Sequence, residues 1–268
     1  MSLHGIDISN WKADFDPMAV DFDFLVVQVT WGTGEVSRNG LVNGVWTGAD
    51  AKIQQCLVKN KRFGYMHYIR GTGAESEATF FAANTVGYLH HGLPCIDWES
   101  ADNKAWGNPS YLDAFLTSYI QQTGIKPLVY VQKSAVHTIE SVAKTHDCGL
   151  WIAQYSDNSS TSYQDHPWNE STYSCTMRQY TSHGRLPGYS GDLDLNKFYG
   201  DEQAWDSYVN ASNDMHALAT TTYTIIQGDT LSGIAQRFHT TISTLATMNN
   251  IIDPNRIYAG DKLQIPRQ

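Results

Sequence analysis

The sequence predicts an α/β protein, with an irregular (β/α) barrel of the TIM type and a small C-terminal βααβ domain. Three observations lead to this fold class. Short runs of β-branched and apolar residues recur eight times before residue 200, and helical patterns separate several of them. The pattern then breaks near residue 209, ahead of a short, separate unit. With 268 residues, 41% of them hydrophobic, the chain is long enough for both domains.

The eight runs are the expected barrel strands. Phe24–Thr30 is almost continuously β-branched, as in a strand that is buried on both faces. The strands are expected at Leu3–Ser9, Phe24–Thr30, Phe63–Tyr68, Leu93–Glu99, Leu128–Gln132, Leu150–Tyr155, Thr176–Thr181 and Leu193–Phe198. Helices are expected at Asn43–Lys59, Glu75–Leu89 and Asn108–Gln122. The last connections lack helical periodicity, so the barrel is expected to be irregular.

The domain boundaries follow from the change in composition. We expect the barrel over residues 1–208 and a linker over 209–221, which is rich in small and polar residues. The second domain is expected over 222–268, with its two strands and two helices at Tyr223–Gln227, Leu231–Phe238, Ile242–Met248 and Lys262–Ile265.

Four carboxylates fall near the ends of predicted strands. Asp97 and Glu99 alternate along one strand, so their side chains point to the same side. Two carboxylates this close shift each other's pKa, which allows one to stay protonated while the other is ionised. Asp7 and Asp194 lie near the ends of the first and last strands. Because chemistry in such barrels gathers at one end, the four predict a site for cleaving a glycosidic bond.

Charge and composition exclude several other functions. The net charge of −9 argues against nucleic acid or an anionic membrane as the main partner. No phosphate-binding loop, dinucleotide-binding turn or metal-ligand spacing is present, so we expect no cofactor and no metal. A bridge between Cys148 and Cys175 is possible but not required. The start shows no signal peptide and no run suits a membrane anchor, which predicts synthesis in a bacterial cytoplasm.

The first 208 residues resemble the glycoside hydrolase family 25 lysozymes, the Chalaropsis-type muramidases. The resemblance rests on ordered motifs: Gly5-Ile6-Asp7-Ile8-Ser9, Gly64-Tyr65-Met66-His67-Tyr68, Ile96-Asp97-Trp98-Glu99, Leu150-Trp151-Ile152-Ala153-Gln154-Tyr155, Gln179-Tyr180-Thr181 and Gly191-Asp192-Leu193-Asp194-Leu195-Asn196. It implies Glu99 as general acid, Asp97 as its partner, and Asp7 and Asp194 as further site residues. The candidates for stacking on sugar rings, with core packing as the alternative, are Tyr68, Trp151, Tyr155 and Tyr180.

Three positions depart from the family pattern. Trp31 stands where the family commonly has glutamate, Arg178 stands where it usually has tryptophan, and Met66 replaces a tyrosine. These departures affect residues that line or support the groove and leave the four carboxylates in place. We therefore expect the reaction to be retained and the recognition of substrate to differ.

The C-terminal unit resembles a LysM module, a family that binds glycans containing N-acetylglucosamine. The resemblance covers Tyr223–Ala235 and continues through Asn249-Asn250 to Leu263-Gln264-Ile265-Pro266. It implies a shallow groove that binds glycan through Gly228, Asp229, Thr230, Leu231, Ile252, Pro254 and Ile257.

Together the two resemblances imply an N-acetylmuramidase that acts on bacterial peptidoglycan, and the absent signal peptide favours a phage endolysin released by a holin. Two alternatives stay open. A chitinase-like enzyme would act on N-acetylglucosamine polymers, although its usual D-x-x-D-x-D-x-E strand is reduced here to Asp97-Trp98-Glu99. A non-catalytic glycan-binding protein would need no carboxylates, and all four are present.

Overall fold

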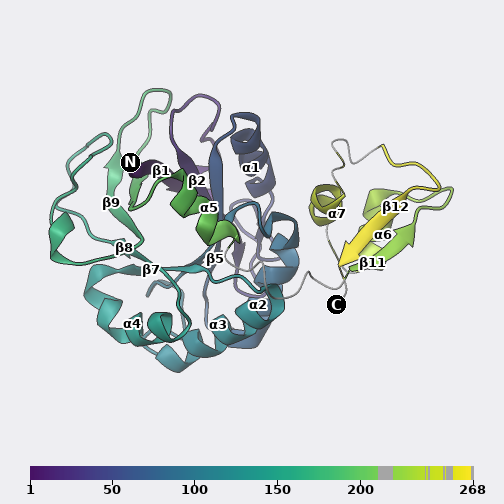
Figure 1. Cartoon of the computed structure of the whole chain (residues 1–268), viewed down its shortest axis with the longest axis horizontal. Coiled ribbons are helices and arrows are strands. Elements are labelled where there is room, and N and C mark those ends of the chain that lie inside the picture. Colours follow the sequence, from purple (N-terminus) through teal and green to yellow (C-terminus); the bar gives the residue numbers. More distant parts are fainter. Residues whose placement is uncertain (211–219, 239, 241, 250, 252–255, 267–268) are drawn as a thin grey trace.

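Eight strands form a closed barrel in the computed structural model, which describes residues 1–210, 220–238, 240, 242–249, 251 and 256–266 (Figure 1). Each strand overlaps one that the sequence predicts, so the expected α/β barrel is confirmed. The strands are Leu3–Ile8 (β1), Phe24–Trp31 (β2), Arg62–Tyr68 (β5), Leu93–Asp97 (β6), Leu128–Gln132 (β7), Leu150–Ala153 (β8), Met177–Gly184 (β9) and Leu193–Phe198 (β10).

The last strand runs against the others. β1, β2 and β5 to β9 pair in parallel, whereas β10 is antiparallel to both β9 and β1 and closes the barrel between them. The first residues of β10 therefore lie at the same end as the last residues of the parallel strands. This direction brings Asp194, which is opposite Asp7 in the β1–β10 register, to the end where the other strands finish.

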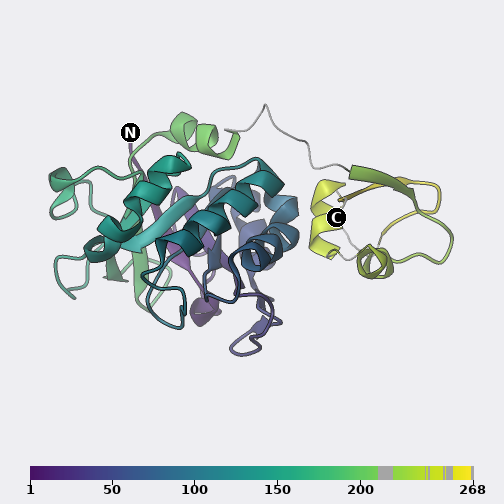
Figure 2. The ribbon, with the colours of Figure 1, turned by 90° about the horizontal axis from the view of Figure 1, so that it is seen from below.

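Helices cover the outside of the barrel (Figure 1, Figure 2). The helices are Ala49–Val58 (α1), Ala74–Thr85 (α2), Pro109–Thr123 (α3) and Val136–Thr145 (α4), with single 3₁₀ turns at Asn10–Lys12, Val86–Tyr88, Lys133–Ala135 and Glu170–Thr172. Apolar side chains between these helices and the strands form one large buried cluster. The connection from β8 to β9 has a 3₁₀ turn but no α-helix, as the missing periodicity predicts.

One predicted helix starts too early. The sequence predicts a helix from Asn43, but α1 starts at Ala49 and is preceded by a hairpin of Leu41–Val42 (β3) and Val45–Trp46 (β4). Asn43 and Gly44 form its turn with φ angles of 48° and 71°. An Asn-Gly pair between two valines strongly favours such a turn because both residues tolerate positive φ.

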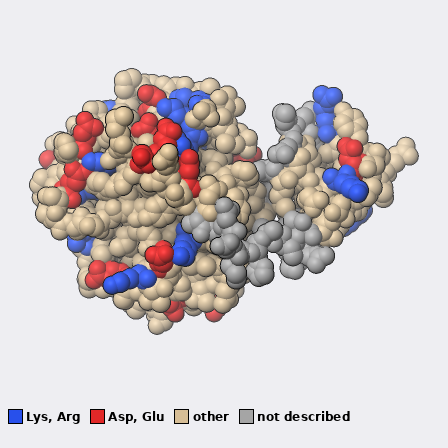
Figure 3. All heavy atoms as spheres, in the orientation of Figure 1, with Lys and Arg blue, Asp and Glu red and all other residues tan. Residues whose placement is uncertain are grey.

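A fifth helix, Glu202–Asn210 (α5), closes the N-terminal end of the barrel. Its Trp205 is buried against Phe24 and Phe198, with ring centroids 4.7 and 5.1 Å away. Arg62 at the start of β5 holds the helix against the barrel through two hydrogen bonds, from Nε and Nη2, to the Asp206 carboxylate. Figure 3 shows acidic and basic side chains interspersed on the face that carries this helix. The opposite end of the barrel, where the parallel strands finish, carries the four carboxylates.

The C-terminal unit has the expected βααβ order. Its elements are Thr220–Thr224 (β11), Leu231–Arg237 (α6), Ile242–Met248 (α7) and Lys262–Pro266 (β12). The two strands pair in antiparallel fashion, and the small core includes Leu231, Ile234 and Leu245. The Thr230 hydroxyl caps α6 by accepting from the Gly233 N–H at 3.1 Å.

All four cysteines are free, so the possible bridge between Cys148 and Cys175 is not formed. Among the residues that the structure describes, no helix is long and apolar enough to cross a membrane.

Candidate active site

The four predicted carboxylates line one cavity of about 300 Å³ at the end where the parallel strands finish. Asp7 lies near the end of β1, Asp97 ends β6, Glu99 follows two residues later, and Asp194 is the second residue of β10. Elements far apart in the sequence thus bring four acidic groups to one place, as the strand ends predict.

The alternation around Asp97 is set by the tryptophan between the two carboxylates. Trp98 is fully buried and points outward, where it packs against Trp106 and Tyr111 at ring distances of 6.1 and 6.4 Å. The backbone N–H of Trp98 donates to the Tyr130 carbonyl at 3.0 Å, which continues the pairing with β7 beyond the end of β6. With Trp98 held outside the barrel, Asp97 and Glu99 both face the cavity.

Burial favours the protonated form of the central pair. It raises the pKa of Asp97 well above its usual value, and the nearby charges of Glu99 and Asp7 raise it further. Asp97 Oδ1 is buried and has no hydrogen-bond partner within the described structure. Burial also raises the pKa of Glu99, opposed in part by a hydrogen bond with Tyr130. Both shifts favour the protonated form of a carboxyl group at this pair, which suits an acid catalyst.

Asp7 is held by two amide donors. Gln179 Nε2 and Asn196 Nδ2 both donate to its Oδ1, at 2.8 and 2.6 Å. Burial raises the pKa of Asp7 to about 6, although these two hydrogen bonds lower it. The amide oxygens are satisfied in turn: Tyr130 and Tyr155 donate to Gln179, and Trp151 Nε1 donates to Asn196.

Asp194 stands beside Asp7 on the neighbouring strand. Burial raises its pKa well above the usual value, and the charge of Asp7 adds to this effect while Lys12 opposes it. Asp7 and Asp194 therefore compete for ionisation, and each makes the charged form of the other more costly.

The aromatic candidates separate into three groups. Tyr68 and Tyr155 line the cavity. Trp151 also lines it, but its ring is fully buried and its N–H is used by Asn196, which leaves no face for a sugar. Tyr180 does not line the cavity. Gln179 faces inward, so the next side chain on β9 points outward into the core, where the Tyr180 hydroxyl accepts from the Gln164 N–H.

Several cavity residues were not predicted as site residues. Gln179 and Asn196 hold Asp7, and Tyr130 contacts the carboxylate network from β7. Two tryptophans, Trp11 and Trp31, add aromatic surface to the cavity wall. Gln179 and Asn196 both occur in the sequence motifs that resemble family 25. Their positions near the predicted strand ends could have indicated a place in the site.

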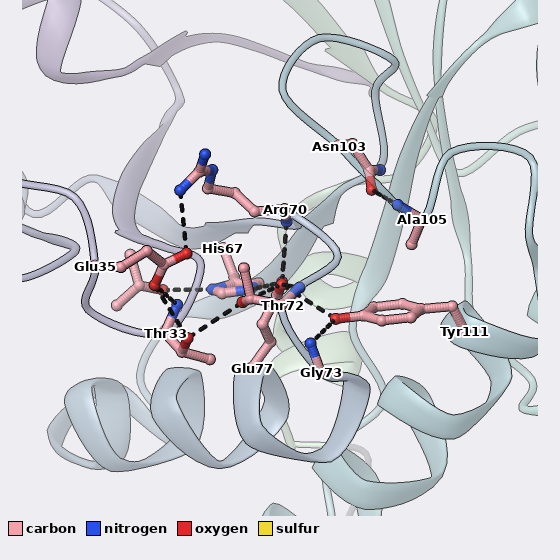
Figure 4. A network of polar contacts seen from close by, with 11 residues as sticks. Thr33, Glu35, His67, Arg70, Thr72, Gly73, Glu77, Asn103, Ala105 and Tyr111 are labelled. Carbon is pink, nitrogen blue, oxygen red and sulfur yellow. Dashed lines mark hydrogen bonds and ion pairs between the residues drawn. The ribbon is translucent and has the colours of Figure 1, made fainter.

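A buried polar group surrounds Glu77 on α2 (Figure 4). His67 Nδ1 is 2.8 Å from the Thr30 hydroxyl, and its Nε2 is 3.1 Å from Glu77 Oε2. Glu77 is fully buried on α2 and accepts further hydrogen bonds from the backbone N–H groups of Arg70 and Thr72. His67 is therefore a hydrogen-bonded residue of the core. The group fixes the loop that follows Tyr68.

A profile of the glycosyl hydrolases of family 25 matches residues 6–189, and a LysM profile matches residues 223–266. The chain belongs to glycosyl hydrolase family 25. It is therefore a glycoside hydrolase that carries a LysM domain.

Individual relatives of this family 25 hydrolase are distant. Uncharacterized protein YegX of Escherichia coli O157:H7 is 24% identical over 226 residues, which cover 78% of this chain and 74% of YegX. The lysozyme of Streptomyces coelicolor superposes with a TM-score of 0.61 at 21% identity, over 79% of this chain and 99% of the lysozyme. The catalytic domain of endolysin ply40, from bacteriophage P40 of Listeria monocytogenes, gives 0.53 at 19% identity, over 78% and 98%.

The departures from the family pattern have clear positions. Trp31 and Met66 line the cavity of this hydrolase, so they change its inner surface directly. Arg178 is fully buried on the outer side of β9 and donates to the carbonyls of Gln154 and Trp168. It thereby supports the connection between β8 and β9.

Only some of the residues predicted to bind glycan in the LysM domain have side chains that are free to contact a ligand. Asp229 Oδ2 accepts from the Tyr223 hydroxyl and the Ile226 N–H, and Gly228 has a φ of 92°, so both shape the turn before α6. Leu231 is 2% exposed and Ile257 packs on the same core, which removes the leucine side chain from any surface groove. The predicted Ile252 and Pro254 lie outside the described residues.

Proposed function

We propose that this family 25 enzyme is an N-acetylmuramidase that hydrolyses the β-1,4 bond between N-acetylmuramic acid and N-acetylglucosamine in bacterial peptidoglycan. The observation that carries the proposal is the gathering of Asp7, Asp97, Glu99 and Asp194 in one cavity. The LysM domain supports the same polymer as substrate.

In the proposed reaction, protonated Glu99 donates its proton to the glycosidic oxygen as the bond to the anomeric carbon breaks. Asp97 stabilises the developing positive charge, either directly or by orienting the N-acetyl group of the substrate as internal nucleophile. The unpartnered, buried Oδ1 of Asp97 is suited to accept the acetamido N–H in the second route. Water then attacks the anomeric carbon and returns a proton to Glu99.

Asp7 and Asp194 are proposed to tune this pair. The charge of Asp7 raises the pKa of Asp97, and the hydrogen bonds from Gln179 and Asn196 fix where that charge lies. Tyr68 and Tyr155 are proposed to contact the sugar rings from the cavity wall, together with Trp11 and Trp31.

The two domains are proposed to divide the work, with residues 1–208 as the catalytic barrel, 209–221 as a linker and 222–268 as the wall-binding module. Within the module, the turn of Gly228, Asp229 and Thr230 is proposed to contact the acetamido groups of the glycan. We further propose that the enzyme acts as an endolysin that reaches the wall through a holin. Co-expression with and without a holin tests this, since lysis should require both proteins.

The Glu99→Gln variant tests the enzyme proposal. It keeps the size of the side chain but cannot supply a carboxylic acid proton, so release of reducing ends from purified peptidoglycan should fall by about 10²–10⁴-fold. Sedimentation with cell walls should stay unchanged. Glu75→Gln, at an exposed position on α2, is the matched control. Full activity of Glu99→Gln would refute the assignment of the acid.

A further inference from the structure

A second cavity, of about 540 Å³, adjoins the one that holds the four carboxylates. The two share Glu99, Tyr130 and Tyr155 as a common wall. The remaining residues of the second cavity are polar or small: Gln132, Lys133, Ser134, Ala153 and Gln154. Glu99 thus stands at the boundary between two compartments of one groove.

The two compartments differ in charge. Asp7, Asp97 and Asp194 line only the first, and the second contains Glu99 together with Lys133. Among the described residues, Lys133 is the one lysine or arginine that lines either cavity. No ion pair of Lys133 with a carboxylate is found in the described part of the chain. Its Nζ lies 4.8 Å from the centre of the Tyr173 ring, which holds the lysine in place.

A second cation contacts the same ring. Arg178 Cζ is 5.2 Å from the centre of Tyr173, and the guanidinium donates to the Gln154 carbonyl, on a residue that lines the second cavity. Arg178 is fully buried, its Nε and Nη1 have no partner, and it forms no ion pair among the described residues. Two positive charges without carboxylate partners therefore flank this end of the groove.

The position of Glu99 assigns a direction to the substrate. A general acid must lie beside the oxygen of the leaving sugar, so that sugar occupies the side of Glu99 away from the other three carboxylates. In the proposed cleavage the leaving sugar is N-acetylglucosamine, and the next sugar is a muramic acid that carries a stem peptide. The free carboxylates of that peptide would meet no lysine or arginine of the first cavity, whereas Lys133 of the second cavity would attract them.

We infer that the second cavity binds the leaving side of the glycan and that Lys133 pairs with a carboxylate of the stem peptide on the muramic acid beyond the leaving sugar. This inference rests on the proposed function. It makes Lys133 a specificity-determining residue that favours strands with stem peptides. An ion pair at a partly exposed lysine contributes little, so we expect a two- to fivefold effect on kcat/KM at low salt, equivalent to roughly 0.4–1 kcal/mol.

The test combines a variant with a chemical change in the substrate. Wild type and Lys133→Met are compared on purified peptidoglycan freed of other wall polymers, with stem carboxylates either free or converted to amides by carbodiimide and ammonia. The ratio of kcat/KM between the two proteins should be two to five on free carboxylates and about one on the amides. Lys133→Arg should restore the wild-type value, and Lys144→Met, at an exposed position on α4, should behave as wild type.

A ratio that is the same on both substrates, including a ratio of one, would overturn the inference. A binding measurement distinguishes this result from a failure of the proposed function. If wild type released no reducing ends from either substrate, the proposed function would be wrong. The role of Lys133 would then be tested by measuring, with calorimetry, how tightly each protein binds soluble glycan fragments that carry stem peptides. Weaker binding to Lys133→Met than to wild type would support the subsite, and equal binding or none would refute it.

Discussion

Trp31 and Tyr68 stand opposite each other on β2 and β5, and their rings contact at a centroid distance of 4.7 Å in the wall of the active-site cavity. The residues just before them, Thr30 and His67, are also register partners, and their side chains meet on the outer side of the barrel. The aromatic wall is thus the inner face of a strand pair whose outer face is fixed by Glu77. This geometry places a buried hydrogen-bonded pair, His67 and Glu77, directly behind the cavity wall.

Glu77→Ala should be strongly destabilising. The change leaves the buried His67 and the N–H groups of Arg70 and Thr72 without their acceptor, so we expect the free energy of unfolding to fall by about 3–5 kcal/mol. Glu75→Ala, an exposed position in the same first turn, should change it by less than about 0.5 kcal/mol. Urea unfolding followed by circular dichroism measures both values. Equal effects would contradict the role given to Glu77.

The stabilising effect of Glu77 should also depend on pH. Burial opposes ionisation, but the hydrogen bonds from His67 and from Thr72 lower the pKa of Glu77 to about 2. Because the pKa is lower in the folded state than in the unfolded state, this contribution is present above about pH 4.5 and is lost as the pH falls towards 2. The stability of Glu77→Gln should therefore approach that of wild type in acid. A difference independent of pH between 2 and 6 would be inconsistent with this account.

Asp7→Asn should show the opposite dependence on pH. Burial raises the pKa of Asp7 from 3.8 to about 6, so its stabilising contribution is complete below about pH 4 and is lost as the pH rises through 6. An asparagine keeps an oxygen for Gln179 and Asn196 but does not ionise. The variant should match wild type near pH 4 and exceed its stability at pH 8, by up to about 3 kcal/mol. Thermal unfolding at both pH values measures this, and lower stability of the variant at pH 8 would contradict it.

Trp11→Ala tests the aromatic mouth of the cavity. This side chain lines the cavity yet is 65% exposed, so its removal should hardly affect stability. Loss of a stacking surface should raise KM for peptidoglycan fragments by roughly 3–10-fold with little change in kcat. Trp168→Ala, which is 54% exposed and does not line the cavity, is the control. An unchanged KM for Trp11→Ala would remove this residue from the substrate site.

The wall-binding role of the LysM domain can be tested at its first turn. Asp229 accepts from the Tyr223 hydroxyl at 2.7 Å and from the Ile226 N–H at 2.9 Å, so Asp229→Ala should disorder the turn that carries Gly228 and Thr230. We expect weaker sedimentation with cell walls and unchanged cleavage of soluble glycan strands. Asp261→Ala, an exposed position before β12, serves as the control. Wall binding unaffected by Asp229→Ala would place the glycan elsewhere.

The sequence predicts the strands and the four carboxylates well because both depend on local patterns. Alternation along Leu93–Glu99 requires Asp97 and Glu99 to share a side once Trp98 is buried. The same rule, applied to β9, would have placed Gln179 inward and Tyr180 outward. Tyr180 was a stacking candidate by residue type, with core packing as the alternative, and the structure places its ring in the core.

What the sequence could not predict depends on contacts between distant segments. The hydrogen bonds of Asn196 and Gln179 to Asp7 join residues 189 and 172 positions apart, and the antiparallel direction of β10 that allows them has no local signal. The hairpin before α1 is different. The Asn43-Gly44 pair indicates a hairpin turn in the sequence itself. The helical spacing of the apolar residues that follow led to the prediction of a helix instead.

The most direct test of the account is the chemical identity of the new chain ends. Purified peptidoglycan is digested with the full chain, the reducing ends are reduced with borohydride, and the products are identified by mass spectrometry. The account predicts reduced muramic acid, formed by wild type and absent with Glu99→Gln. Reduced glucosamine at the new ends would contradict the assigned bond, and no new ends at all would contradict the assignment of this site as a muramidase.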